Sequence, residues 1–257
     1  MHTFLFKYLV FGPINSRRLG RSLGVNILPK EHKFCNFDCV YCEHGENSEE
    51  LSKIDFPSVE EIIEELLLKS QMLSDRAIEI DTISFTGNGE PTLHPQFEEI
   101  VYAVKNIRDL IFPSAKIAVL NNASMLDQSS VQNALEVADY SICKLDAGDE
   151  ASFLIINRPK GDIRLKNIIR NLKRNKETLI IQSLFFKGIN DNTDIGNSSE
   201  EHLQSYFKQL EEIQPKNVML YSLDKSSPFK DLEALKLTEL KKIAQQINAL
   251  GISASVA

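Results

Sequence analysis

Apolar and polar positions along this chain follow two alternating patterns. Short runs that are apolar almost throughout, such as residues 22–28, are typical of buried strands. Segments with apolar residues at 3.6-residue spacing, such as residues 57–73, indicate amphipathic helices, and Pro57 is placed to open this one with acidic residues in its early turns. The pattern therefore predicts a protein that mixes helices and strands.

The same alternation continues to the end of the chain. Further strands are expected at residues 80–89, 115–122, 139–148, 178–188 and 217–223, with a short last strand at 252–256. Further helices are expected at residues 95–109, 127–138, 162–175, 199–213 and 237–250. Asp127 is placed to cap the helix that it begins. Residues 186–200 are rich in Asn, Asp, Gly and Ser, and we expect them to form a mobile loop at the rim of the fold.

A strand followed by a helix, six times over, predicts right-handed crossovers and a parallel sheet. Six units favour a partial (β/α)6 barrel of the α/β class, in which ligands bind at the carboxyl ends of the strands. No linker or low-complexity stretch divides the chain. We therefore expect a single domain over residues 1–257, with residues 1–21 as an N-terminal extension and residues 22–257 as the β/α core.

Composition and charge narrow the class of protein. The 257 residues are 42% hydrophobic and 25% charged, which is ordinary for a globular protein with a sizeable core. No apolar run is long enough to cross a bilayer, and no cleavage site follows the brief apolar start, so we expect a cytoplasmic protein without membrane attachment. The net charge of −7 weighs against a large nucleic-acid substrate without excluding one.

Three of the four cysteines, Cys35, Cys39 and Cys42, lie within eight positions in a C-x3-C-x2-C pattern. A structural zinc needs four ligands, and only the distant Cys143 or the poorly spaced His44 could complete the set, which leaves a zinc-stabilised binding module as a weak alternative. A thioredoxin-like pair would have no third cysteine. Three thiolates instead suit an iron–sulfur cubane with one iron left open, where the amine and carboxylate of an amino acid could chelate.

The segment CNFDCVYC, with Tyr41 just before the third cysteine, resembles the signature of the radical S-adenosylmethionine (SAM) superfamily. The resemblance implies a [4Fe–4S] cluster on Cys35, Cys39 and Cys42 and SAM on the open iron. One electron from the cluster would cleave SAM to a 5′-deoxyadenosyl radical that abstracts hydrogen from a substrate. The resemblance also implies an iron–sulfur oxidoreductase or lyase type of chemistry, and an electron donor such as flavodoxin or ferredoxin.

The segment GNGEP resembles the GGE motif of the same superfamily, which contacts the amine of the methionyl group. It implies that SAM is contacted by Gly87, Asn88, Gly89 and Glu90. Two glycines allow the backbone to approach a ligand closely, and an acid suits an ammonium group. A lone glycine-rich turn would be weak evidence without the cysteine pattern.

Two further segments place polar residues at strand ends. Asn121 and Asn122 stand where the superfamily often has Thr-Asn-Gly, although a local turn would explain them equally well. Strand alternation places Lys144 and Asp146 on one face, inside the barrel, where the carboxylate and ribose hydroxyls of SAM could be their partners. Cys143 lies on the other face and is expected to be a small buried residue rather than a ligand.

The remaining candidates lie later in the strands or on predicted loops. Gln182 and Ser222 could contact the nucleoside of SAM, or could merely satisfy the local backbone. Arg17, Arg18 and Arg158 are expected on solvated loops, and in a functional role they would bind a carboxylate or a phosphate of the substrate.

The segments FGPINSRRLGRSLGVNILP, SFTGNGEPTLHP, KLDAGDEASFLIINRP and VMLYSLD together resemble the wyosine-base-related iron–sulfur oxidoreductases, whose best-understood members modify a tRNA base. Residues 1–34 contain no cysteine, which favours a standalone member with a single cluster. In size the chain also resembles the glycyl-radical-enzyme activases, which act on a partner protein. The substrate therefore stays open between a tRNA base, a protein or peptide, and a small molecule.

Overall fold

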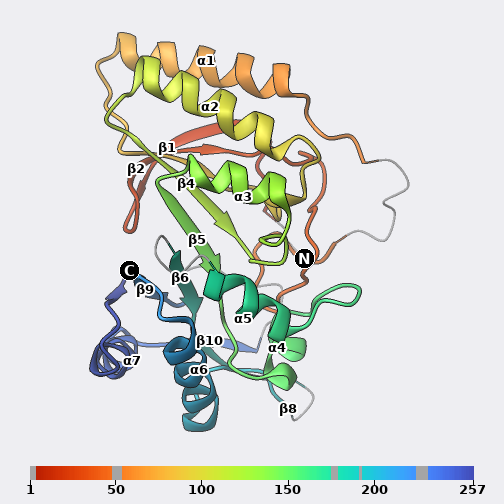
Figure 1. The fold of residues 1–257 in the computed structure, drawn as a ribbon, viewed down its shortest axis with the longest axis vertical. Helices are drawn as coiled ribbons and strands as arrows, with labels where there is room; N and C mark the ends of the chain where they lie inside the picture. The colour runs from red at the N-terminus through yellow and green to blue at the C-terminus, as the bar shows by residue number, and fades with distance from the viewer. Residues whose placement is uncertain (1–3, 48–53, 175–178, 191–192, 224–230) are drawn as a thin grey trace.

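A computed structural model describes residues 4–47, 54–174, 179–190, 193–223 and 231–257. Its main sheet curls into a half barrel (Figure 1), and every neighbouring pair of its strands is parallel except the first pair, which is antiparallel. The strands follow the order β1 (Val10–Ser16), β2 (Gly20–Val25), β3 (Thr82–Phe85), β4 (Lys116–Asn121), β5 (Tyr140–Lys144), β6 (Leu179–Leu184), β9 (Asn217–Tyr221) and β11 (Ala254–Val256). This architecture confirms the expected fold class.

Helices cover the outside of the curled sheet (Figure 1). The helices are α1 (Val59–Asp75), α2 (Phe97–Ile111), α3 (Ser129–Glu136), α4 (Glu150–Ile156), α5 (Leu165–Arg174), α6 (Glu200–Ile213), α7 (Leu237–Ala249) and the short 3₁₀ turn η1 (Pro91–Leu93). The start of α1 is a capping box, in which the Ser58 hydroxyl accepts from the backbone N–H of Glu61 and the Glu61 carboxylate accepts from that of Ser58. None of the described helices is long and apolar enough to span a bilayer.

The two faces of the sheet differ in what they bury. The large hydrophobic core lies between the sheet and the helices and includes Val119 and Ile181. A much smaller cluster occupies the concave side, where the buried residues Ala118, Ile142 and Ile180 pack together with the turn between β1 and β2. Because few apolar side chains fill the concave side, polar groups can line it at the carboxyl ends of the strands.

Three expectations about local structure were wrong. Asp127 does not cap α3, whose first flanking residue is Gln128 and carries no side-chain cap. Residues 186–200 do not form a plain loop, because β7 (Phe186–Asn190) pairs antiparallel with both β8 (Thr193–Asp194) and β10 (Leu232–Ala234). Helix α4 was not expected, although Asp149 caps it through the backbone N–H of Ser152. Residues 175–178, 191 and 192 of the expected elements lie outside the described residues.

Candidate active site

A cavity of about 590 Å³ lies on the concave side of the half barrel, at the carboxyl ends of β3, β4, β5, β6 and β9, within the size range of small-molecule sites. Most of the residues that the sequence singled out line it together. They are Arg17, Arg18, Cys35, Cys39, Tyr41, Cys42, Gly87, Gly89, Glu90, Asn121, Asn122, Lys144, Gln182 and Ser222. Segments far apart in the sequence therefore meet in one place, as the parallel sheet predicts.

Three of the expected residues do not line this cavity. Asn88 is fully buried, and its side-chain amide instead exchanges hydrogen bonds with the backbone of Phe6 and donates to the carbonyl of Pro29. Arg158 forms an ion pair with Glu46 at 3.2 Å, away from the cavity. The third residue, Asp146, lies directly behind the cavity wall and is described below.

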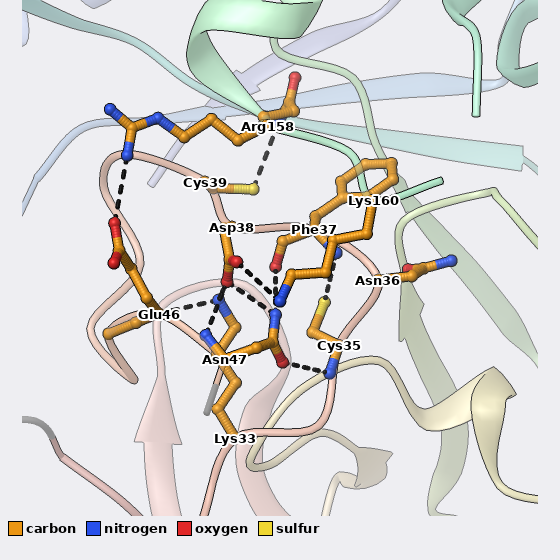
Figure 2. A network of polar contacts seen from close by, with 12 residues as sticks. Lys33, Cys35, Asn36, Phe37, Asp38, Cys39, Glu46, Asn47, Arg158 and Lys160 are labelled. Carbon is orange, nitrogen blue, oxygen red and sulfur yellow. Dashed lines mark hydrogen bonds and ion pairs between the residues drawn. The ribbon is translucent and has the colours of Figure 1, made fainter. Parts of the chain in front are cut away.

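The cysteine loop is held in shape by a polar network (Figure 2). The Lys33 ammonium lies 3.1 Å from Asp38 Oδ1 and donates to the carbonyl of Gly45 at 2.8 Å. Lys160 approaches the other oxygen of the same carboxylate at 3.2 Å. Asn47 donates to Asp38 through both its backbone N–H and its side chain, and its Oδ1 accepts from the backbone N–H of Cys35. The fold therefore orders the loop through its own hydrogen bonds.

Burial disfavours the thiolate form of two thiols of this loop, Cys35 and Cys39. Burial raises the pKa of Cys39 to about 11 and raises that of Cys35 further. Few donors reach these sulfurs: Cys35 Sγ accepts from the backbone N–H of Phe37 at 3.4 Å and from Asn122 Nδ2 at 4.0 Å, and Cys39 Sγ accepts from Asn157 Nδ2 at 3.4 Å. Thiols with raised pKa values give up their protons when a cation binds, so this loop suits an iron centre better than free thiolate chemistry.

Lys33 places a positive charge among these thiols. Its side chain is only 2% exposed, so it is held there without water. Burial alone would lower the pKa of Lys33, but the negative charges that the three loop thiols and Asp38 can carry raise it above its ordinary value. The residue is thus a permanent cation, suited to an anionic group bound by the cysteines.

Asp146 joins the cysteine loop to the sheet. Its side chain is wholly buried, and it accepts hydrogen bonds from the Tyr41 hydroxyl, from Asn157 Nδ2 at 3.1 Å and from the backbone N–H of Leu184 at 2.9 Å. The Lys144 ammonium lies 3.1 Å from its Oδ1. Asp146 therefore fixes two side chains that line the cavity, Tyr41 and Lys144, without lining it itself.

Glu90 supplies a carboxylate that lines the cavity itself. It is 2% exposed, and its oxygens accept from the backbone N–H groups of Thr92 at 3.0 Å and Asn122 at 2.7 Å. Burial raises its pKa to about 7 in spite of these hydrogen bonds. A ligand that brought an ammonium group here would favour the ionised carboxylate.

The glycine segment, residues 87–89, packs in direct backbone contact against the cysteine loop. A Cβ atom on Gly89 would lie 1.8 Å from the carbonyl oxygen of Phe34, and the φ angle of Gly89 is +151°. The backbones of the two segments are hydrogen bonded on both sides of this point, from Phe34 to Asn88 at 2.8 Å and from Glu90 to Phe34 at 3.0 Å. Glycine at position 89 therefore permits the contact that brings the two motifs together.

Lys33, Asn157 and Tyr221 are among the residues lining the cavity that sequence reasoning missed. Lys33 stands two residues before the first cysteine, and Asn157 next to a candidate arginine, so proximity in sequence was the available signal. The Tyr221 hydroxyl accepts from Lys144 at 2.9 Å, and its ring lies 4.4 Å from the guanidinium carbon of Arg18. The Ser222 hydroxyl, by contrast, is used by the backbone, since it donates to Phe185 and accepts from Leu235.

Comparison with protein families identifies the chain. The family model described as the radical SAM superfamily matches residues 32–195, which include the cysteine loop and the strands from β3 to β6. This chain belongs to the radical SAM superfamily. That membership implies a [4Fe–4S] cluster and SAM as cofactors. The more specific resemblance to the wyosine-base-related subgroup stays a prediction.

Several named proteins are similar to this radical SAM chain. A Helicobacter pylori protein named "UPF0026 protein" is 34% identical over 239 residues, which cover 90% of this chain and 70% of that protein. A Brachyspira hyodysenteriae protein named "GTPase Obg" is 32% identical over 245 residues, 93% of this chain. The chain spans only 33% of that protein's length.

Two solved structures illustrate the fold that this chain shares with other proteins. A radical SAM methyltransferase from Sphaerobacter thermophilus matches with a TM-score of 0.66 and 13% identity, over 92% of this chain and 65% of that one. Streptococcus suis SuiB bound to S-adenosylmethionine matches with a TM-score of 0.63 and 13% identity, over 91% of this chain and 50% of that one. At this level of identity the matches show the shared fold.

The residues of this radical SAM chain fit an iron–sulfur cluster. Three half-buried thiols line one cavity beside a buried cation, and the cluster itself would be anionic. Within the described ranges, no three His, Cys, Asp or Glu side chains are arranged around a single metal position. Three thiolates can bind three irons of a cubane, one each. The donor set therefore fits the cluster that the family implies.

Proposed function

We propose that this chain is a radical SAM enzyme in which Cys35, Cys39 and Cys42 hold a [4Fe–4S] cluster. When bound, the cluster supplies the electron that cleaves SAM to a 5′-deoxyadenosyl radical, which abstracts hydrogen from the substrate. The observation that carries this proposal is the single cavity in which three thiols meet the glycine segment and the polar strand ends.

The proposed SAM contacts come from the ends of five strands, β3, β4, β5, β6 and β9, and from the cysteine loop. Glu90 and the backbone of Gly87 and Gly89 would receive the methionyl ammonium, since a carboxylate and close backbone approach suit that group. Lys144 would attract the carboxylate, because its ammonium is already placed against the cavity by Asp146. Further contacts are proposed for Tyr41, Asn121, Asn122, Gln182 and Ser222, whereas Asn88 and Asp146 would act by holding the wall in place.

Other parts of the proposal concern the whole protein. We propose that the described strands and helices form one domain, since β1 joins the same sheet as the β/α core. We further propose a cytoplasmic location, where thiols stay reduced, and a flavodoxin or ferredoxin as the electron donor. Arg17 and Arg18 would lie on the substrate side of the cavity. The substrate could be a tRNA base, a partner protein, as for the glycyl-radical activases, or a small molecule.

Anaerobic reconstitution tests the proposal. The protein should bind about four irons per chain and become brown, and dithionite with SAM should yield 5′-deoxyadenosine. Changing any one of the three loop cysteines to serine should abolish iron binding and the formation of 5′-deoxyadenosine. Cys143→Ser, at a buried cysteine outside the cavity, should leave both properties unchanged. Glu90→Ala should weaken SAM binding while the iron content stays the same. A colourless protein with one zinc per chain, or a cluster that does not respond to SAM, would refute the proposal.

A further inference from the structure

We propose that Arg18 and Tyr221 form an oxyanion-binding subsite, and that the substrate is a small molecule bearing a carboxylate or a phosphate. The assignment of this ligand as substrate rests on the proposed function. The subsite itself is a binding property of the chain, and it can be tested without iron or SAM.

Arg18 lies in an unusual position in the half barrel. It stands in the turn between β1 and β2, at one edge of the main sheet, yet its guanidinium lies 4.4 Å from the ring centroid of Tyr221 on β9, next to the other edge. Both residues line the cavity. The side chain therefore reaches from the first hairpin of the sheet to β9 and forms part of the cavity wall.

Among the described residues, no anionic group balances the charge on Arg18. Its Nη1 atom is buried and has no hydrogen-bond partner, and none of the ion pairs among the described residues involves Arg18. Lys144, the neighbouring cation, is by contrast paired with Asp146. A cation that has lost part of its water without gaining an anion raises the free energy of the free protein, and an arriving oxyanion would relieve that cost.

The geometry also indicates which chemical class would bind. A guanidinium stacked on an aromatic ring keeps its N–H edge free, and that edge matches the two oxygens of a carboxylate or phosphate. The Tyr221 hydroxyl accepts from Lys144 at 2.9 Å, so its own hydrogen is left to donate to a ligand oxygen. The Arg18 guanidinium and the Tyr221 hydroxyl thus offer hydrogen-bond donors in one region of the cavity wall.

The size and charge of the site favour a small ligand. The cavity is about 590 Å³, and the proposed SAM would take part of that volume. The chain carries a net charge of −7, so a polyanion would be repelled as a whole while a single oxyanion group could still be held locally. A compact substrate with one or two anionic groups satisfies both conditions.

The test compares two arginines of the same hairpin. Arg18→Gln removes the guanidinium that is proposed to bind the oxyanion. Arg21→Gln removes the same charge from an exposed side chain in β2 that does not line the cavity. The iron-free full-length protein is titrated with inorganic phosphate and, separately, with acetate, against sodium chloride at equal ionic strength. Thermal unfolding reports binding, because a ligand of the folded state raises the melting temperature with its concentration.

Wild type and Arg21→Gln should respond alike to at least one of the two anions, and Arg18→Gln should weaken that binding by about tenfold or more, as expected for a charged hydrogen bond. A stronger response to phosphate would indicate a phosphorylated substrate, and a stronger response to acetate a carboxylate. Arg18→Lys, which keeps the charge but loses the planar fork, should fall between these values and provides a second variant if Arg18→Gln folds poorly.

Two results would overturn the subsite: no anion-specific response in wild type, or equal responses in wild type and Arg18→Gln. The second result would mean that Arg18 only ties β9 to the hairpin through its stacking. Because no step uses the cluster, failure of SAM cleavage in the reconstituted protein would refute the proposed function and leave these titrations standing.

Discussion

Lys33 and Lys160 contact the two oxygens of the same carboxylate, Asp38, but in very different surroundings. The Lys33 side chain is 2% exposed and lies among the three loop thiols, whereas the Lys160 side chain is 46% exposed. The same formal charge should therefore act on a bound cluster with very different strength, because water screens an exposed cation.

Lys33→Gln should make the reduction potential of the reconstituted cluster more negative, by on the order of tens of millivolts, because a nearby cation favours the state with the extra electron. Lys160→Gln serves as the matched control and should shift the potential much less. A redox titration followed by electron paramagnetic resonance measures both, with iron content as the check on loading. Equal shifts would contradict a special role for the buried lysine.

Glu90 gives the stability of the iron-free protein a dependence on pH. Burial raises its pKa to about 7, so the folded state favours the protonated carboxyl. The stabilising contribution is complete below the ordinary pKa of 4.5 and is lost as the pH rises through 7. Over that range the group accounts for on the order of 3 kcal/mol of the free energy of unfolding.

Between pH 4.5 and pH 8, the free energy of unfolding of Glu90→Gln should fall less with rising pH than that of wild type. Urea denaturation at several pH values measures the two slopes. The slopes are the quantity to compare, since a glutamine amide would face the backbone donor of Asn122 and lower stability at every pH. Parallel slopes would show that Glu90 does not titrate in this range.

Single positions differ in how far the sequence could predict them. The cysteine spacing pointed to the three thiols, and strand alternation placed Lys144 and Asp146 on one face of their strand without predicting that they pair with each other. Asn88 lies within the same GNGEP motif as Glu90, but the backbone turns its amide toward the N-terminal segment. The direction of a side chain in an irregular loop depends on backbone angles and distant partners, which sequence spacing does not encode.

At the scale of elements, the contact between the glycine segment and the cysteine loop depends on one missing side chain. Gly89 leaves no space for a Cβ beside Phe34, whereas Gly161 also has a positive φ angle, of +68°, but has no heavy atom within 4 Å of where a Cβ would be. Substitution of Gly161 therefore tests the free-energy cost of the backbone conformation alone. Substitution of Gly89 adds the cost of a steric clash.

Gly161→Ala should cost about 1 kcal/mol of unfolding free energy, from the backbone conformation alone. Gly89→Ala should cost several times as much, because the two segments must move apart. Urea denaturation gives both values, and the alkylation rate of Cys35 gives a second readout that should rise only in Gly89→Ala. Equal costs, with unchanged alkylation, would show that the contact is not tight in solution.

Regular elements were predictable where a local period marks them. The helices with 3.6-residue apolar spacing and the buried strands of the main sheet were found close to their observed ends, α2 within about two residues. The small sheet of β7, β8 and β10 was missed because its strands are short, and because β10 pairs from more than forty positions away. Pairing over such a distance leaves no local period to detect.

At the scale of the whole molecule, the parallel sheet accounts for most of the candidate site. Parallel strands all end at one edge, so motifs that follow successive strands converge there, and knowledge of the fold class was enough to predict their meeting. The stacking of Arg18 on Tyr221 could not be predicted in this way. It depends on how strongly the sheet curls, which is set by the packing of all its strands and helices together.

The polar network around Asp38 also bears on whether the protein persists after it loses its cluster. Because Lys33, Asn47 and Lys160 hold the cysteine loop through contacts within the protein, we expect the loop to keep its shape without iron, unlike small zinc domains that unfold when stripped of metal. A molecule that loses its inorganic centre to oxygen would stay intact, ready to be refilled. Repair after oxidation of the cluster would then require iron and sulfide but no synthesis of a new chain.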